Sequence, residues 1–357
     1  MKNASNAFMA RAAKLAWKGK GKVEPNPMVG AIFIKNKKII AEGWHQKFGG
    51  PHAEINAIQA AKKAKKSLKG ATLYVTLEPC CHYGKQPPCT EALKALRLKK
   101  VIFATLDPNP LVRGKGIKIL KKAGIITEKM ETHETRDLNA IYLTNTLKKR
   151  PFIHLKTACT QDGKITLQKG KSTALTGEKS QKKVHELRAR YDGILIGVNT
   201  LLIDNPRLTV RSVKPTKNPT RIILDSHLRT PFSSQIFKEK GHTILATTTP
   251  LPSGKKLPPR TTLLVCKKTK TGKIDLHDLL KKLFALNIRS VLIEGGEQVN
   301  TSFLKAKLVD HVTFIFTPHR ANNASLPSLF DRKILPKIHF NNPSFIKIGK
   351  DLWVEMS

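Results

Sequence analysis

The sequence is poor in acidic residues. Its 357 residues include 25 Asp and Glu against 65 Lys and Arg, which gives a formal net charge of +40. Such an excess first suggests a nucleic-acid partner. The lysines, however, are scattered in short runs typical of solvated helix faces, without the interleaved Arg and aromatic residues that stack on bases. We therefore interpret the charge as compositional bias and expect no nucleic-acid partner, although a basic surface also attracts phosphorylated small substrates.

Long apolar runs are also missing. No run approaches the roughly 20 residues that a helix needs to cross a bilayer, so we expect no membrane partner. The basic, Ala-rich segment Met1–Lys22 has no apolar signal core, which argues against secretion. Cysteines are few: the five are Cys80, Cys81, Cys89, Cys159 and Cys266. The first three lie in one short segment. This distribution argues against a disulfide scaffold and indicates a reducing cytoplasm.

What the sequence does contain is alternating helix and strand patterns in two blocks, as its length suggests for two α/β domains. The first block predicts helices at Ala4–Lys18, His52–Lys66, Cys89–Leu98 and Gly116–Ala123, and strands at Val29–Ile34, Ile39–Trp44, Ala71–Leu77, Val101–Thr105 and Ile125–Thr127. A long helix from Glu131 to Lys149 then ends before Pro151, because proline stops helices. We place the domain boundary there, giving domains 1–148 and 149–357.

The second block repeats the alternation. Its strands are predicted at Phe152–Ala158, Gly193–Gly197, Arg221–Asp225, Thr243–Thr247, Leu263–Cys266, Ser290–Ile293, Val312–Thr317 and Ile346–Val354. Helices are predicted at Glu178–Ala189 and His277–Leu286. We therefore expect a second α/β domain.

The most specific motif is His52-Ala53-Glu54, followed by Glu78-Pro79-Cys80-Cys81-His82 and then Cys89. An imidazole and two thiolates, from His52, Cys80 and Cys89, make a three-ligand zinc site whose fourth position stays open for water. Zinc lowers the pKa of such a water toward about 7. Glu54 is then the general acid/base that carries a proton to a departing amine, as in zinc deaminases.

Two alternatives stay open at this site. Cys81 or His82 could supply a fourth ligand and make the zinc structural, but a closed site has no use for Glu54 beside the histidine ligand. Cys81 could also replace Cys80 as the ligand. We favour Cys80, because it keeps the Pro-Cys pair and because a helix beginning near it would direct its thiolate inward.

These motifs resemble the cytidine-deaminase-like superfamily. The long spacing from Cys80 to Cys89 narrows the resemblance to the deaminase half of the bifunctional deaminase/reductase family of riboflavin biosynthesis. Other segments match in order: Pro25–Gly30, Gly43–His45, Gly49–His52, Asp107–Pro110 and Gly114–Gly116. The resemblance implies a three-layer α/β/α domain that removes the 2-amino group of 2,5-diamino-6-(5-phosphoribosylamino)pyrimidin-4-one. It also suggests Asn26 as a pyrimidine contact, and His82 and Lys85 as contacts of the base or phosphate; all three could equally be turn or loop residues.

The resemblance continues through the second half, to a reductase of the dihydrofolate-reductase fold. It implies that NADPH reduces the ribosyl group to ribityl. Implied cofactor contacts are Ala158, Ala174, Thr200, Asp204, Ser226, Gly295 and Gly296, the two glycines admitting a diphosphate. Implied substrate contacts are Lys156, Ser172, Arg188, Leu208, Arg211 and Glu294. Arg188 and Arg211, together with Lys156, suit a phosphate clamp, and Glu294 suits the sugar hydroxyls. Singly, each of these has an ordinary alternative as a surface, turn or loop residue.

The chain departs from the family pattern at two places. Ala174 stands where an aromatic residue is usual, and His319–Asn323 replaces a segment that usually contains glycine. Alternative functions are therefore a deaminase with an impaired reductase domain, a nucleic-acid-editing zinc deaminase, or a noncatalytic zinc scaffold. Related enzymes associate through their reductase domains, so the resemblance also implies a homo-oligomer, a dimer or a tetramer.

Overall fold

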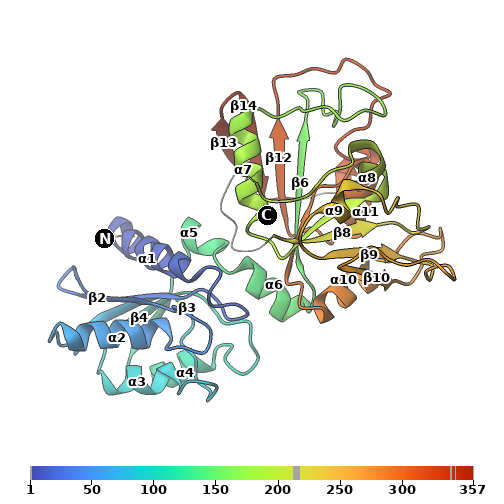
Figure 1. The fold of residues 1–357 in the computed structure, drawn as a ribbon. Coiled ribbons are helices and arrows are strands. Elements are labelled where there is room, and N and C mark those ends of the chain that lie inside the picture. The colour runs from blue at the N-terminus through green and yellow to red at the C-terminus, as the bar shows by residue number, and fades with distance from the viewer. Residues whose placement is uncertain (1, 212–217, 338–339, 342, 357) are drawn as a thin grey trace. The chain divides into compact units, whose positions relative to one another are not determined.

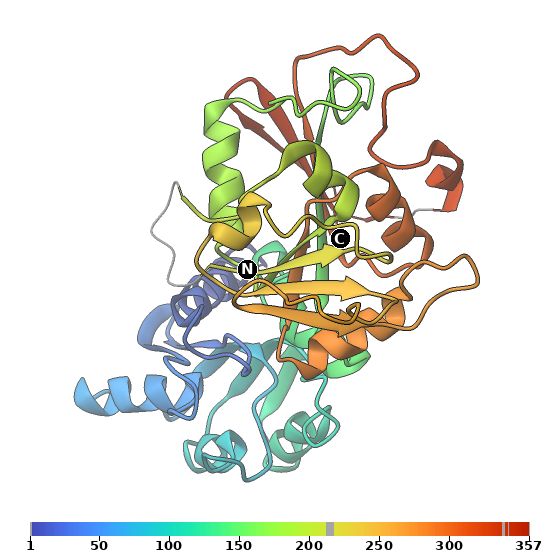
Figure 2. The same cartoon turned by 45° about the vertical axis from the view of Figure 1, so that its right-hand side comes forward.

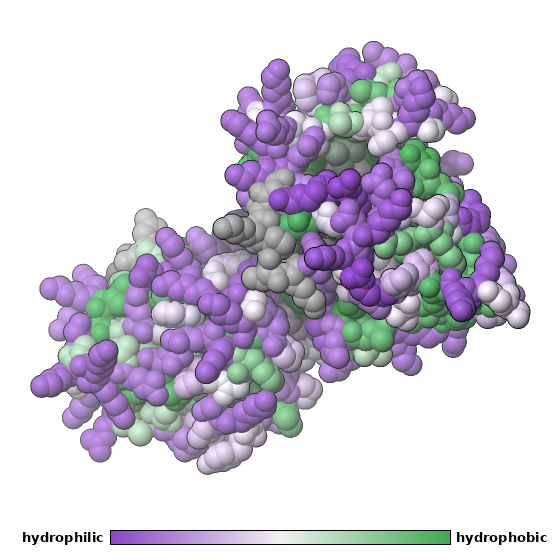
Figure 3. Space-filling model, viewed as in Figure 1, coloured by the Kyte–Doolittle hydropathy of each residue, from purple (hydrophilic) through white to green (hydrophobic). Residues whose placement is uncertain are grey.

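The chain folds into two compact units. The computed structural model describes residues 2–211, 218–337, 340–341 and 343–356. Contacts divide the chain into Met1–Lys148 and Lys149–Ser357. Within the described part of the chain, no helix has both the length and the apolar character that crossing a membrane requires. Hydrophilic residues dominate the faces of both units that are visible in Figure 3, as expected for lysines on solvated helices.

The first unit is a five-stranded sheet between two helical layers (Figure 1). The strand order is β2-β1-β3-β4-β5, with β1 antiparallel to β2 and β3, and with β3, β4 and β5 parallel. Helix α1 packs on one face, and α2, α3 and α4 pack on the other. The bounds are α1 (Lys2–Ala16), β1 (Gly30–Lys35), β2 (Lys38–Trp44), α2 (Ala53–Lys63), β3 (Thr72–Leu77), α3 (Cys89–Ala95), β4 (Lys100–Thr105), α4 (Lys115–Lys122) and β5 (Ile126–Lys129). The predicted three-layer α/β/α fold is confirmed.

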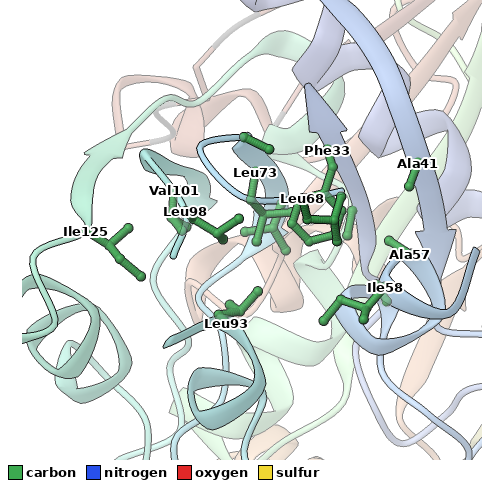
Figure 4. Packing of buried hydrophobic residues seen from close by; sticks show 14 of the residues in the cluster. Phe33, Ala41, Ala57, Ile58, Leu68, Leu73, Leu93, Leu98, Val101 and Ile125 are labelled. Atoms are coloured by element: carbon green, nitrogen blue, oxygen red, sulfur yellow. The ribbon is translucent and has the colours of Figure 1, made fainter. Parts of the chain in front are cut away.

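Alternation along the strands builds both cores of this unit, because successive strand residues point to opposite faces of a sheet. Phe33, Leu73 and Val101 point to the α2–α4 side, where they pack with Leu93 of α3 (Figure 4). Their chain neighbours Ile32, Tyr74 and Ile102 face α1. Gly43 is required where α2 crosses β2, since a Cβ there would lie 2.3 Å from the backbone nitrogen of Ala57.

The second unit is a nine-stranded sheet in the order β10-β9-β8-β7-β11-β6-β12-β14-β13 (Figure 2). Strands from β10 through β12 are parallel, and β14 and β13 complete the sheet antiparallel. Its strands are β6 (Phe152–Cys159), β7 (Gly193–Gly197), β8 (Thr220–Leu224), β9 (Thr243–Thr247), β10 (Thr261–Val265), β11 (Ser290–Ile293), β12 (His311–Phe316), β13 (Ser344–Ile348) and β14 (Asp351–Met356). This is the second α/β domain that the sequence predicted.

Helices cover both faces of the second sheet. On one face lie α7 (Glu178–Arg188), α8 (Val198–Asp204) and α9 (Gln235–Lys238). On the other lie α10 (Leu276–Ala285) and α11 (Glu297–Lys305), whose Leu279, Leu283 and Phe303 pack against the aliphatic residues of β6, β7 and β11.

The long helix predicted from Glu131 to Lys149 is wrong. It is two helices, α5 (His133–Arg136) and α6 (Ala140–Lys148), separated at residues 137–139. The break lets Leu138 pack against α1, and the Asn139 amide exchanges two hydrogen bonds of 2.9 Å with the backbone of Met28. Tertiary contacts of the intervening residues thus override the helical pattern.

Three further element predictions differ from the structure. The predicted closing strand Ile346–Val354 is a hairpin of β13 and β14, which turns at Gly349 with a φ of 63°. Helices α8 and α11 are absent from the predicted elements, and the ordinary alternatives there are a turn at Asp204–Pro206 and a loop at Gly295-Gly296. Both segments are instead the ends of short helices.

His154, on β6, is a buried histidine whose ring nitrogens both have partners. Its Nδ1 lies 2.5 Å from the Tyr191 hydroxyl, and its Nε2 lies 2.8 Å from the hydroxyl of Thr313. Burial, together with neighbouring His311, lowers the pKa of His154 well below its usual 6.5. The folded protein therefore keeps this ring neutral at pH values where an unfolded chain would protonate it.

Stability should consequently fall as the pH drops below 6.5, since the unfolded chain then binds a proton that the folded chain does not, at about 1.4 kcal/mol per pH unit. We expect His154→Gln to remove this part of the pH dependence, whatever it does to stability at pH 7.5. Denaturant unfolding of the full chain between pH 7.5 and 5 measures the slope. The exposed His277→Gln is the matched control, and equal slopes in all three proteins would contradict the prediction.

Candidate active sites

Three potential metal ligands meet in the first unit. The Nδ1 of His52 and the sulfurs of Cys80 and Cys89 all lie within 4.8 Å of one another, and the nitrogen is 3.4 Å from each sulfur. His52 immediately precedes α2, Cys80 follows β3, and Cys89 begins α3. The fold thus joins residues that are up to 37 positions apart in sequence.

The charges of this cluster fit a divalent cation. Hydrogen bonds from Cys89 and His52 lower the pKa of Cys80 to about 4. The hydrogen bond to Cys80, burial and the nearby Glu54 raise the pKa of Cys89 well above its usual value. Two adjacent sulfurs can both be anionic only beside a cation, and one imidazole with two thiolates is a zinc donor set.

The geometry favours Cys80 over Cys81 as the ligand. Cys81 points away from His52 and donates to the carbonyl of Leu111 at 3.5 Å. Among the described residues, the cluster contains no fourth protein ligand, which leaves a coordination position for water. The helix expected near Cys80 is wrong, because α3 begins only at Cys89. Cys80 is instead directed inward by the Cys89 N–H, which it accepts at 3.3 Å.

Glu54 lies in the first turn of α2 and is only 3% exposed. Burial raises its pKa to about 7. Its side chain lines a cavity of about 280 Å³ together with His52 and Cys80. A carboxyl group in this place can reach both a metal-bound ligand and a substrate in the cavity, as a general acid/base must.

Asn26 also lines this cavity, and its orientation is set by a short chain of hydrogen bonds. His45 Nδ1 lies 3.0 Å from the carbonyl of Pro51, which can only accept. Burial lowers the pKa of His45, so the neutral ring uses Nε2 to accept from the Asn26 amide nitrogen at 3.4 Å. The Asn26 amide oxygen is thereby left as the acceptor for a ligand.

Other residues of the cavity were not singled out from the sequence. Asp107 and Asn109 reach it from the segment after β4, and Tyr142 reaches it from α6. The Tyr142 hydroxyl donates to Asp107 at 3.0 Å. Asp107 and Asn109 lie in a segment that carries the family resemblance. No sequence feature marks Tyr142, because the sequence predicts one long helix there and not the break at residues 137–139 that sets the direction of α6.

Glu78 organises the loop that carries Asp107. Its carboxylate, 3% exposed, accepts backbone N–H groups of Asp107 at 3.3 Å, Gly114 at 2.9 Å and Ile117 at 3.2 Å. Gly116 permits this approach, since a Cβ there would lie 2.2 Å from the carbonyl oxygen of Pro79. The loop is therefore held against the strand end that leads to Cys80.

The second unit has a cavity of about 440 Å³ beyond the carboxyl ends of β7, β8 and β11. Four of the implied cofactor contacts line it: Thr200, Asp204, Ser226 and Gly296. The first turns of α8 and α11 meet there, because Gly295 leaves room for Val299: a Cβ on Gly295 would lie 2.6 Å from that side chain. Two helix N-termini at one cavity suit a diphosphate.

Two implied cofactor residues lie elsewhere. The side chain of Ala158 packs with Ile315 and Trp353, and Ala174 is exposed in the segment before α7. Gly295 shapes the cavity through its close contact with Val299 rather than by lining it. Ser172 hydrogen-bonds Asp204, which brings it to the edge of the cavity.

Two cations of the implied phosphate clamp, Arg188 and Lys156, are already paired with Glu294. Arg188 makes two hydrogen bonds to Glu294, of 2.7 and 2.9 Å, and Lys156 makes one of 3.0 Å. Burial opposes the ionised form, but Arg188 and Lys156 together lower the pKa of Glu294. Two cations on one carboxylate leave a positive surplus for an anionic ligand.

A second, polar cavity of about 390 Å³ adjoins this cluster. Arg188, Leu208 and Arg211 line it as implied, and Arg207 also lines it although no motif in the sequence singled it out. Arg211 donates to the Thr209 hydroxyl at 3.0 Å. Asp204 borders both cavities, so the two cavities adjoin.

The divergent segment His319–Asn323 has an ordered anchor. The Asp162 carboxylate accepts the backbone N–H groups of Ala321 at 3.1 Å and Asn322 at 3.0 Å, and Gln161 N–H donates to the His319 carbonyl at 2.9 Å. The replacement thus leaves this loop attached to the end of β6.

Comparison with known proteins matches both units. The family model described as cytidine and deoxycytidylate deaminase zinc-binding region matches residues 2–105, and that of the RibD C-terminal domain matches residues 151–353. The riboflavin biosynthesis protein RibD of Aquifex aeolicus is 40% identical over 97% of this chain and 96% of its own length. That of Escherichia coli is 36% identical over 87% of each.

Solved structures agree over nearly the whole length. A diaminohydroxyphosphoribosylaminopyrimidine deaminase/5-amino-6-(5-phosphoribosylamino)uracil reductase of Thermotoga maritima is similar with a TM-score of 0.82 and 38% identity, covering 99% of this chain and 98% of its own. RibD of Acinetobacter baumannii has a TM-score of 0.78 and 32% identity at the same coverage.

Glu78→Gln tests the loop anchor. The new amide presents an N–H group where three N–H donors converge, so we expect the first unit to lose about 1–3 kcal/mol of stability. Ammonia release from the expected pyrimidine should fall about tenfold while zinc content stays constant, since a misplaced loop weakens transition-state contacts. The exposed Glu91→Gln is the control. Unchanged activity and unchanged unfolding in Glu78→Gln would refute the role.

Proposed function

Because the chain belongs to the RibD family of riboflavin biosynthesis, it is a zinc-dependent deaminase joined to an NADPH-dependent reductase, and we propose which of its residues carry each activity. The deaminase converts 2,5-diamino-6-(5-phosphoribosylamino)pyrimidin-4-one to the corresponding aminouracil. The reductase then reduces the ribosyl group to ribityl. A deaminase-only enzyme and a nucleic-acid-editing deaminase are not favoured, because the reductase family matches residues 151–353.

The observation that carries the deaminase assignment is one buried carboxyl group that lines the same cavity as His52 and Cys80, two of the three converging metal ligands. His52, Cys80 and Cys89 hold the zinc, which supplies Lewis-acid activation of water at neutral pH. Glu54 takes a proton from the attacking water and delivers it to the 2-amino group, which leaves as ammonia. Water supplies the oxygen of the new carbonyl, so no other reactant is needed.

Recognition of the pyrimidine rests on the amide oxygen of Asn26. Its nitrogen already donates to His45, so the oxygen accepts from the base. Lys85 and His82, which also line the cavity, lie on the loop between β3 and α3 and contact the base or the phosphate. The positive charge of Lys85, held 4.1 Å from the centre of the Phe48 ring, suits the phosphate.

In the second unit we propose that NADPH occupies the cavity of about 440 Å³. Thr200, Asp204, Ser226 and Gly296 contact it, and Gly295 admits its diphosphate between α8 and α11. Ala158 and Ala174 are included as cofactor contacts only because the family resemblance implies them. The small Ala174 side chain offers no flat surface for stacking.

The phosphorylated open-chain sugar is held beside this cavity. Arg188, Arg211 and Lys156 bind its phosphate and hydroxyl oxygens, while Leu208 and Ser172 border it. Glu294 accepts from the sugar hydroxyls, and its pairing with Arg188 and Lys156 fixes the direction of its oxygens. NADPH held in the adjoining cavity would supply hydride for the former carbonyl carbon of the sugar, and a solvent proton would complete the reduction.

We also propose a homo-oligomer, a dimer or a tetramer, formed through the reductase units. The edge strand β13 supports this, because Phe345 and Ile346 are exposed apolar residues on a strand with an unpaired edge. A reducing cytoplasm suits the site as well. All five cysteines are free, and zinc binding requires that Cys80 and Cys89 stay reduced.

Glu54→Gln tests the deaminase mechanism. We expect ammonia release to fall by at least about a hundredfold, because the amide cannot exchange a proton with the water or the amine. Zinc content measured by elemental analysis should stay near that of the unchanged protein, whereas Cys89→Ser should lower it. Retained activity in Glu54→Gln, or zinc that survives Cys89→Ser, counts against the assignment.

Mass spectrometry separates the two reactions. The purified chain with the pyrimidine substrate alone should replace one NH by an oxygen, and addition of NADPH should then add two hydrogens. Products of the first step that accumulate unchanged with NADPH would remove the reductase assignment. An unreacted substrate with an active reductase on supplied aminouracil would remove the deaminase assignment.

A further inference from the structure

The proposed cofactor cavity has a basic wall that the family resemblance does not explain. His227, Arg229 and Lys273 line it, the first two from the turn that follows β8 and Lys273 from the hairpin bonded to that turn. We propose that Arg229 and Lys273 bind the 2′-phosphate of NADPH and so set the preference of the reductase for NADPH over NADH. The inference rests on the proposed cofactor site and assigns its specificity.

The position of Arg229 is fixed by the backbone around it. Asp225, fully buried at the end of β8, accepts both the N–H and the hydroxyl of Thr230 at 2.7 Å, which closes a turn over residues 226–229. The Arg229 guanidinium donates to Asn199 in the first turn of α8 at 2.9 Å. That bond uses one of five guanidinium N–H groups and leaves the others for a ligand.

Lys273 reaches the same wall from the segment between β10 and α10. That segment is a small hairpin, closed by a bridge between Lys268 and Ile274 and by the Thr269 N–H, which donates to the Lys273 carbonyl at 2.7 Å. The Ile274 N–H donates to the Ser226 hydroxyl at 3.3 Å. The hairpin is thus attached to the residue that begins the Arg229 turn.

The positive charges of Arg229 and Lys273 are available to bind an anionic ligand. Within the described ranges, neither Arg229 nor Lys273 has an ion pair with a carboxylate. The two acids of the cavity have other partners: Glu297 accepts the Ser328 N–H at 3.1 Å, and Asp204 hydrogen-bonds Ser172. Two cations that line one cavity match a phosphate monoester, which NADPH carries and NADH replaces by a neutral hydroxyl.

The place of the wall agrees with a dinucleotide lying across the carboxyl ends of the strands. In doubly wound α/β folds, the diphosphate lies at a helix N-terminus, and the residues after the neighbouring strand contact the adenosine ribose. Here the first residues of α8 and α11 line the cavity, and the Ser226–Arg229 turn follows β8, the next strand after β7 in the sheet. An Arg at that turn is the chemistry that accommodates a 2′-phosphate.

Titration with both nucleotides tests the proposal. NADPH and NADH are titrated into the full, zinc-loaded chain and followed by nicotinamide fluorescence. The proteins compared are unchanged chain, Arg229→Gln, Lys273→Gln and the double variant. Lys270→Gln is the matched control, because it removes the same charge from the same hairpin but does not line the cavity.

We expect the double variant to bind NADPH about 10- to 100-fold more weakly, while its affinity for NADH changes less than about twofold. Each single variant should lie between, and Lys270→Gln should match the unchanged chain. Adenosine 2′-monophosphate should displace NADH from the unchanged chain and fail to do so from the double variant. This competition and the unfolding midpoint separate a lost contact from a lost fold.

Different failures point to different conclusions. An unchanged chain that binds NADPH tightly, with a double variant that keeps its preference for NADPH over NADH, overturns this inference alone. Equal losses for NADPH and NADH in the double variant also overturn it, because the residues then act on the shared part of the nucleotide. An unchanged chain that binds neither nucleotide overturns the proposed cofactor site, and this inference with it.

Discussion

Two cysteine sulfurs placed beside each other in a buried site can both be ionised only if a cation joins them, and the first unit is organised around that constraint. Cys80 and Cys89 come from opposite ends of a loop, and His52 closes the triangle from the start of α2. Each ligand stands where a regular element begins or ends, so the sheet and two helices together define the site. Metal binding and folding are therefore coupled in this unit.

Residues around that triangle constrain the shape of the site. Gly43 lets α2 lie close against β2, which sets the position of His52 at the start of that helix. Glu78 holds the loop that carries Asp107. His45 turns the Asn26 amide toward the cavity. These are backbone and hydrogen-bond constraints, and their effect is to leave one metal position and one carboxyl group facing the same small space.

The second unit also buries charged groups, here one carboxylate between two cations. Glu294 is buried, and the cost of burying its charge is offset by Arg188 and Lys156. Both units place their cavities where strands end and helices begin, since backbone N–H groups and loop side chains converge there. The general excess of lysine is spread over the surface, but at the proposed cofactor cavity Arg229 and Lys273 have no carboxylate ion-pair partner among the described residues.

Much of this could be predicted from the chain itself. The spacing of His52, Glu54, Cys80 and Cys89 indicated a metal-dependent deaminase, because only a few residue types bind zinc and exchange protons. Strand alternation indicated which residues face each core, and the domain families followed from motifs in order. Short helices such as α8, and the break before α6, could not be predicted from the sequence. Tertiary packing and not the local residue pattern determines where they form.

The tertiary structure alone decided how side chains pair. It turned Cys81 toward Leu111 and away from the metal ligands, joined Tyr142 to Asp107, and set Glu294 between two cations. It also gathered Arg229 and Lys273 on one wall from segments some forty residues apart. Local sequence determines which groups are available and which face of an element they occupy. Their distances depend on the packing of elements remote in the chain, which no local pattern encodes.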